Sequence, residues 1–178
     1  MKTNNIFPST LATLLAATAL FAVNENNGGT GSVTAADKNF MVAAAEGGML
    51  EVRLGEVAEK KGASQEVKDF GAMMVSDHGK AGEDLKAVAA KHGVAVPSTL
   101  DAKHKAIVDR LAKLSGSAFD KAYIDEMLKD HMKDASAFEG VAKNAQDPDL
   151  KAFAQRTLPI IKAHLAKIKS MAGEHKST

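Results

Sequence analysis

The sequence predicts an all-α fold, a four-helix bundle with an extra short helix between its second and third long helices. Apolar residues recur at helical spacing through four long segments of the 178-residue chain. Mostly short turns join these segments, as in bundles whose neighbouring helices pack along their length. Aromatic residues make up only 4% of the chain, which is typical of long helices packed through small and aliphatic side chains.

The long helices are expected at residues 37–61, 64–92, 117–145 and 148–172. Residues typical of helix starts and ends bound these segments: Asp37, Ser64 and Pro148 at starts, and Gly62 and Gly93 at ends. A shorter helical pattern at residues 100–114 is either a separate crossover helix or the first part of a kinked third helix. This choice decides whether the third long helix runs parallel or antiparallel to the second.

Two consecutive glycines, Gly47 and Gly48, fall inside the first predicted helix. Each costs a helix interior roughly 1 kcal/mol relative to Ala. We expect a neighbouring helix or a bulky side chain to approach closely at this point and to offset that cost.

Residues 1–23 have the pattern of an export signal. Lys2 precedes an apolar run from Leu11 to Val23, which suits a signal peptide and is too short to span a membrane. Cleavage is expected between residues 22 and 36, with residues 24–36 as a flexible linker, 37–172 as the bundle and 173–178 as a polar tail. We therefore expect a periplasmic or secreted protein without an integral membrane span in its mature chain. A single membrane anchor is the alternative.

Charge and cysteine content exclude several classes of function. The net charge of +1 gives no indication of a nucleic-acid or membrane-surface binder. The chain has no cysteine, which excludes disulfides, thiolate zinc sites, Cys-ligated iron–sulfur clusters and a lipidated Cys. Protein partners and the oligomeric state stay open.

Two stretches, Phe70–Lys80 and Tyr123–Lys133, repeat one pattern near the middle of two predicted helices. Five positions correspond at a single offset: Phe70/Tyr123, Met74/Met127, Asp77/Asp130, His78/His131 and Lys80/Lys133. A bundle core is apolar at this depth, so polar residues on an inward face need partners. The repeat therefore marks equivalent positions on two helices.

A candidate metal site follows from counting along each helix. His78, His131 and His164 each lie near the middle of a predicted helix, so they share one depth whichever way the helices run. Glu51 lies at a similar depth in the first helix. Bundles build metal sites from such inward-facing residues, and imidazole suits zinc, copper and iron. We predict these four residues as metal ligands, with the metal left open.

Five neighbouring residues are candidates for a supporting shell: Asp77, Asp130, Met74, Met127 and Tyr123. The two aspartates lie about 100° around the helix from the adjacent histidines, so they would orient a histidine of another helix or pair with lysines. The methionines are either soft copper(I) ligands or core packing residues. The tyrosine is expected in the core with its hydroxyl bonded.

An interpretation without a metal remains open. Each histidine would then be a core-edge residue with an ordinary hydrogen-bond partner, and the protein would be a non-catalytic interaction or stress-protective module. Catalysis is less expected, because no helix carries the Glu-x-x-His motif of di-iron carboxylate sites and no nucleophile elbow or phosphate loop is present. His92, His104 and His175 are interpreted as solvated.

Taken in order, several short matches resemble a known family. They are Ala44–Val52 with Leu54 and Gly55; Val67–Phe70 with Met74, Val75, Asp77 and His78; Phe119, Asp120, Tyr123 and His131; and Phe153, Ala154, Leu158, Pro159 and His164. Together they resemble the bacterial exported proteins grouped as a domain of unknown function and often labelled "putative outer membrane protein". The resemblance implies a ferritin-like four-helix bundle outside the cytoplasm and implies little about chemistry.

Overall fold

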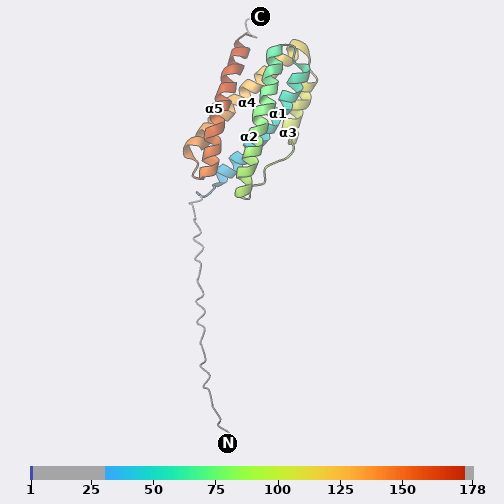
Figure 1. Ribbon diagram of the computed structural model, residues 1–178. Helices are drawn as coiled ribbons and strands as arrows, with labels where there is room; N and C mark the ends of the chain where they lie inside the picture. Colours follow the sequence, from blue (N-terminus) through green and yellow to red (C-terminus); the bar gives the residue numbers. More distant parts are fainter. Residues whose placement is uncertain (2–30, 175–178) are drawn as a thin grey trace.

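The computed structural model describes Met1 and residues 31–174, and this part of the chain contains five helices (Figure 1). Four are long, namely α1 (Ala35–Lys61), α2 (Gln65–Lys91), α4 (Gly116–Asn144) and α5 (Pro148–Glu174), and α3 (Ala102–Ala112) is short. The predicted all-α bundle with an extra short helix is confirmed. The predicted export signal and most of the linker and tail lie outside the described residues. Among the described helices, none combines the length and apolarity needed to cross a bilayer.

The first helix begins earlier than predicted because a different residue caps it. Thr34, not Asp37, is the N-cap, and its hydroxyl accepts a hydrogen bond from the Asp37 backbone N–H at 3.1 Å. The Asp37 carboxylate in turn accepts from the Thr34 backbone N–H at 2.9 Å. This reciprocal capping box starts the helix at Ala35, within the segment predicted as linker.

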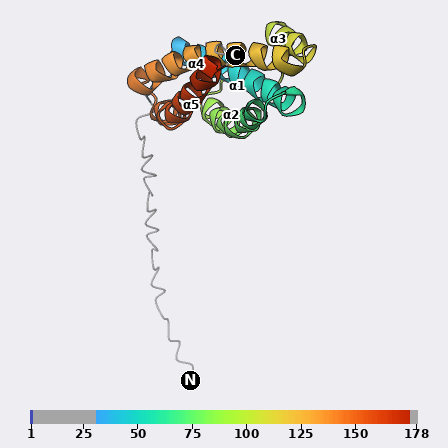
Figure 2. The ribbon, with the colours of Figure 1, turned by 90° about the horizontal axis from the view of Figure 1, so that it is seen from above.

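The short helix α3 is a separate crossover that lies at the edge of the bundle (Figure 2). Its presence makes α2 and α4 parallel. At one end, the Asp120 carboxylate of α4 accepts hydrogen bonds from the N–H groups of Ala63 and Ser64, which precede α2. At the other end, His92 after α2 lies 3.2 Å from Asp147, which precedes α5. One crossover between two antiparallel helix pairs is the connectivity of ferritin-like bundles.

A polar layer divides the hydrophobic core into two clusters. One cluster contains Leu54, Phe70 and Tyr123, and the other contains Leu85 and Phe138. Each long helix contributes apolar side chains to both clusters and a polar residue between them. The core therefore has a buried polar level at the middle of the bundle, and its polar atoms need partners there.

Close helix contact occurs at other glycines than those predicted. A Cβ on Gly55 would lie 2.6 Å from the Gly71 carbonyl oxygen, so α1 and α2 pack backbone to backbone there. A Cβ on Gly47 would come no closer than 3.8 Å to Asp134, and one on Gly48 would meet no atom of the described residues within 4 Å. The predicted close approach at Gly47 and Gly48 is therefore wrong, since the helix contact lies two turns further along α1.

Candidate metal centre

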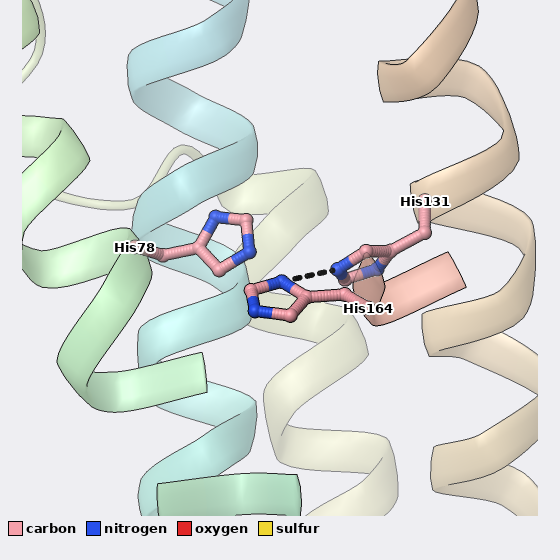
Figure 3. A group of neighbouring side chains, drawn as sticks. All are labelled: His78, His131 and His164. Atoms are coloured by element: carbon pink, nitrogen blue, oxygen red, sulfur yellow. Dashed lines mark hydrogen bonds between the residues drawn. The ribbon is translucent and has the colours of Figure 1, made fainter. Parts of the chain in front are cut away.

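Three histidines from three helices converge at the middle of the bundle. His78 of α2, His131 of α4 and His164 of α5 each place one ring nitrogen within 4.8 Å of the other two (Figure 3). The exposed fractions of the three residues are 8%, 0% and 2%. Imidazoles that share a buried level in this way form a common polar site in an otherwise apolar core.

Glu51 of α1 completes the ring of four helices around this level. Its Oε2 lies 2.7 Å from His78 Nδ1, and its Oε1 lies 3.2 Å from His131 Nδ1. Neither contact is aligned as a hydrogen bond, so both buried carboxyl oxygens have no hydrogen-bond partner among the residues that the structure describes. His78 Nε2 is likewise buried and has no hydrogen-bond partner within Met1 and residues 31–174. Such orphaned polar atoms are uncommon in folded proteins and call for an explanation.

Two of the histidines are held in defined tautomers by oxygen acceptors. His131 Nδ1 lies 3.0 Å from the Met127 carbonyl oxygen, which accepts only, so this nitrogen carries the proton. His164 Nε2 lies 2.9 Å from the Asp77 carboxylate and donates to it. A neutral imidazole has one N–H, so the opposite nitrogen of each ring presents a lone pair.

These two lone pairs face each other. His131 Nε2 and His164 Nδ1 are 3.4 Å apart, the long contact drawn as a dashed line in Figure 3. With His131 protonated at Nδ1 and His164 at Nε2, a hydrogen bond across this contact needs an additional proton on one ring. Without a proton or another cation between them, the two lone pairs repel.

Burial disfavours that additional proton. It lowers the pKa of His78 to about 4 and also lowers the pKa values of His131 and His164. It raises the pKa of Glu51 to about 7, against the opposing attraction of His131. At neutral pH the three imidazoles are therefore neutral and keep their lone pairs, and the His78–Glu51 contact is no salt bridge.

The other predicted residues take several positions around this level. The Asp77 carboxylate contacts His164 of another helix, in agreement with one of the two predicted roles. Asp130 instead has a buried oxygen with no hydrogen-bond partner among the described residues. Met74 and Met127 lie in the hydrophobic core, and Met127 contributes its backbone carbonyl. The Tyr123 hydroxyl is buried and has no hydrogen-bond partner in the described part of the chain, contrary to the expectation that it is bonded.

Asp134 belongs to the site and was missed in the sequence. It lines a cavity of about 20 Å³ together with Glu51, His78 and Thr157, room for one water-sized group. Burial, followed by the charge of Glu51, raises the pKa of Asp134 to about 7. Its position three residues after His131 puts it on the same helix face, which is the signal that could have found it.

Two histidines outside the cluster differ from the prediction. His92 and His104 are mostly buried and lie beside Asp147 and Asp101, so they are not solvated. Glu46, Asp101 and His104 also place ligand-type atoms within 4.8 Å of one another. Asp101, however, is exposed and accepts the His104 backbone N–H at 2.7 Å as the cap of α3, so helix capping accounts for its position.

The fold and this cluster define the class of protein: an all-α bundle with a buried layer of histidines and carboxyl groups. Residues 23–171 match the family described as "Domain of unknown function (DUF4142)", and the chain belongs to this family. It is also similar in fold to the crystal structure of a DUF305 fragment from Deinococcus radiodurans. The two are 11% identical, with a TM-score of 0.68 over 80% of this chain and 98% of that one. No curated protein matches the chain.

Proposed function

We propose that this protein is an exported metal-binding bundle that holds one transition-metal ion between His78, His131 and His164. The facing lone pairs of His131 and His164 carry the proposal. Burial makes a proton an unfavourable occupant of the space between them, and a metal ion accepts both lone pairs. Imidazole nitrogens suit zinc, copper and iron.

The distances fit a shared ion. Two nitrogens bound to one tetrahedral zinc at about 2.0–2.1 Å lie about 3.3–3.4 Å apart. The observed 3.4 Å between His131 Nε2 and His164 Nδ1 agrees with this value. His78 supplies the third donor, since one of its ring nitrogens lies within 4.8 Å of the ligand atoms of the other two and its buried Nε2 has no partner among the described residues.

The second nitrogen of each ring also fits a metal site. Histidine ligands usually place their other ring nitrogen on a carboxylate or a carbonyl. Here those oxygens belong to Glu51 for His78, Met127 for His131 and Asp77 for His164. Glu51 is predicted from the sequence as a fourth ligand. Its contacts with the Nδ1 atoms of two rings instead support a role in orienting the ligands.

Export is part of the proposal and rests on the sequence. The apolar run from Leu11 to Val23 behind Lys2 has the length of a signal peptide. N-terminal sequencing of the mature chain tests it, and a chain that retains its first 20 or so residues would contradict it.

Metal analysis of protein purified without a histidine tag tests the proposed function. The protein is stripped with a chelator and offered zinc, copper or iron singly, and we expect one ion bound per chain. A variant with both H131A and H164A should bind none at this site. If the wild-type protein folds and binds none of the three metals, the interaction module without a metal becomes the better interpretation.

Asp77 and Asp130 provide a matched pair of variants, because each directly precedes a site histidine in the sequence. Of the two, only the Asp77 carboxylate accepts a hydrogen bond from a site histidine, His164. We expect D77A to weaken metal binding 10- to 100-fold, the usual effect of removing such a partner. D130A should change the affinity much less. Competition titration against a metal-binding dye measures both, and equal losses in the two variants would contradict the assignment of Asp77.

A further inference from the structure

A groove on the surface of the bundle reaches the candidate site from one side. It has a volume of about 750 Å³ and lies between α1, α2, the connection after α2 and α3. Met49 and Val52 of α1 line one wall, and Val96 and Leu100 of the connection line another. Of the three site histidines, only His78 is among the residues that line it.

Glycines form part of the floor of this groove. Gly48 of α1 and Gly79 and Gly82 of α2 all line it, and within the described chain a Cβ at any of them would meet nothing closer than 4 Å. Each glycine in a helix interior costs about 1 kcal/mol relative to Ala. Helix packing does not require these three, in contrast to Gly55 and Gly71. Because glycine has no side chain, these positions keep the groove deep where α1 and α2 pass His78.

The groove meets the small cavity inside the bundle. Gly48, His78 and Gly82 line both, so two glycines flank His78 at the junction. On the inner side the same cavity is lined by Glu51 and Asp134. A continuous series of lining residues therefore leads from solvent past His78 to the carboxyl groups of the polar layer.

We propose that this groove is the passage by which a transition-metal ion enters and leaves the three-histidine site. The inference rests on the proposed function. The volume is ample for a hydrated ion, since six waters occupy about 180 Å³. His78 is the most exposed of the three histidines and the first that an ion in the groove meets. It takes the ion from water and passes it to the deeper pair, His131 and His164.

Blocking the passage tests this inference. G82L places a side chain over the junction from an exposed position with open space around it. G48L does so from α1. G140L is the matched control, because Gly140 also lies in a helix interior with nothing within 4 Å of its Cβ, but does not line the groove.

Stopped-flow measurements give the rates of zinc binding to metal-free protein and of zinc release to excess chelator. We expect G82L and G48L to slow both rates by tenfold or more and to leave the dissociation constant within about twofold, since a barrier on a path acts in both directions. G140L should match the wild type. Unchanged rates in both groove variants would overturn the inference, as would a changed affinity with an unchanged association rate.

A readout without metal separates this inference from the proposed function. Diethyl pyrocarbonate modifies accessible neutral imidazoles, and mass spectrometry locates the modified residue. In metal-free wild type and G140L we expect His78 to react before His131 and His164, and G82L should protect it. If the wild type binds no zinc, the proposed function fails while this measurement still reports whether the groove opens on His78. Equal reaction of His78 in G82L and wild type would show that the groove is not the route to His78.

Discussion

Metal-free protein given zinc at about one hundred times its dissociation constant is expected to melt roughly 5–10 °C higher. A ligand that binds only the folded chain at this excess adds about 2.7 kcal/mol to the free energy of unfolding. For a domain of this size, each kcal/mol raises the melting temperature by about 2–4 °C. Calorimetry or the loss of helical circular dichroism on heating, with and without chelator, measures the rise. The same experiment applies to copper and iron.

The rise should disappear in H131A. His131 is fully buried and faces both other histidines, so its loss removes a donor that water cannot replace. The substitution also leaves a cavity that lowers the melting temperature of the metal-free chain, so the zinc-dependent rise is the quantity compared. H131Q keeps more of the side-chain volume and serves if H131A does not fold. H92A, a mostly buried histidine outside the cluster, should retain the rise. An undiminished zinc-dependent rise in the melting temperature of H131A would show that the metal binds at another site.

The depth of the site was predictable because it depends only on counting along helices. His78, His131 and His164 lie near the midpoints of their helices, and midpoints stay level whether neighbouring helices run parallel or antiparallel. The direction of α4 was therefore irrelevant to the site, although it decides the fold. Predicting that direction required knowing that α3 ends before Gly116. Gly116 has a φ of +62°, a conformation that favours glycine.

The partners within the polar level were less predictable, because they depend on how each helix is rotated and on what faces it. Asp77 and Asp130 have the same sequence context, yet Asp77 contacts His164, whereas one buried oxygen of Asp130 finds no partner in the part of the chain that the structure describes. The Met127 carbonyl carries no sequence signal at all, since every residue has one. Gly48 shows the same limit, because a glycine at a groove and a glycine at a helix contact look alike in the sequence.

Replacing Glu51 with Gln is expected to stabilise the metal-free protein at neutral and alkaline pH. Folding raises the pKa of this carboxyl from 4.5 to about 7, chiefly because burial disfavours its charged form. A folded chain that binds a proton more tightly than the unfolded chain loses stability as pH rises. The loss attributable to Glu51 begins near pH 4.5 and is complete above about pH 7. The amide of E51Q carries no charge and avoids that loss.

The size of the effect follows from the same two pKa values. A carboxyl whose pKa rises from 4.5 to about 7 on folding contributes about 3 kcal/mol of destabilisation once it is ionised. Urea unfolding of both proteins should therefore show little difference at pH 4, a growing advantage of E51Q through pH 5–7, and a plateau of about 2–4 kcal/mol at pH 8. The exposed Glu56, which pairs with Arg53 at the surface, gives the control E56Q, for which we expect almost no effect.

Metal should reverse the sign of this substitution. With an ion bound to the histidines, the Glu51 carboxylate accepts the Nδ1 proton of His78 and lies beside His131 Nδ1, so its charge is compensated. E51Q should then weaken metal binding about 10- to 100-fold, which corresponds to about 1.4–2.7 kcal/mol. E51Q would then stabilise the metal-free chain and weaken the metal complex. Such opposite effects are expected of a residue that supports metal binding rather than folding. If E51Q destabilises the metal-free protein at pH 8, Glu51 instead serves the packing of the bundle, and the burial of its charge is compensated without a metal.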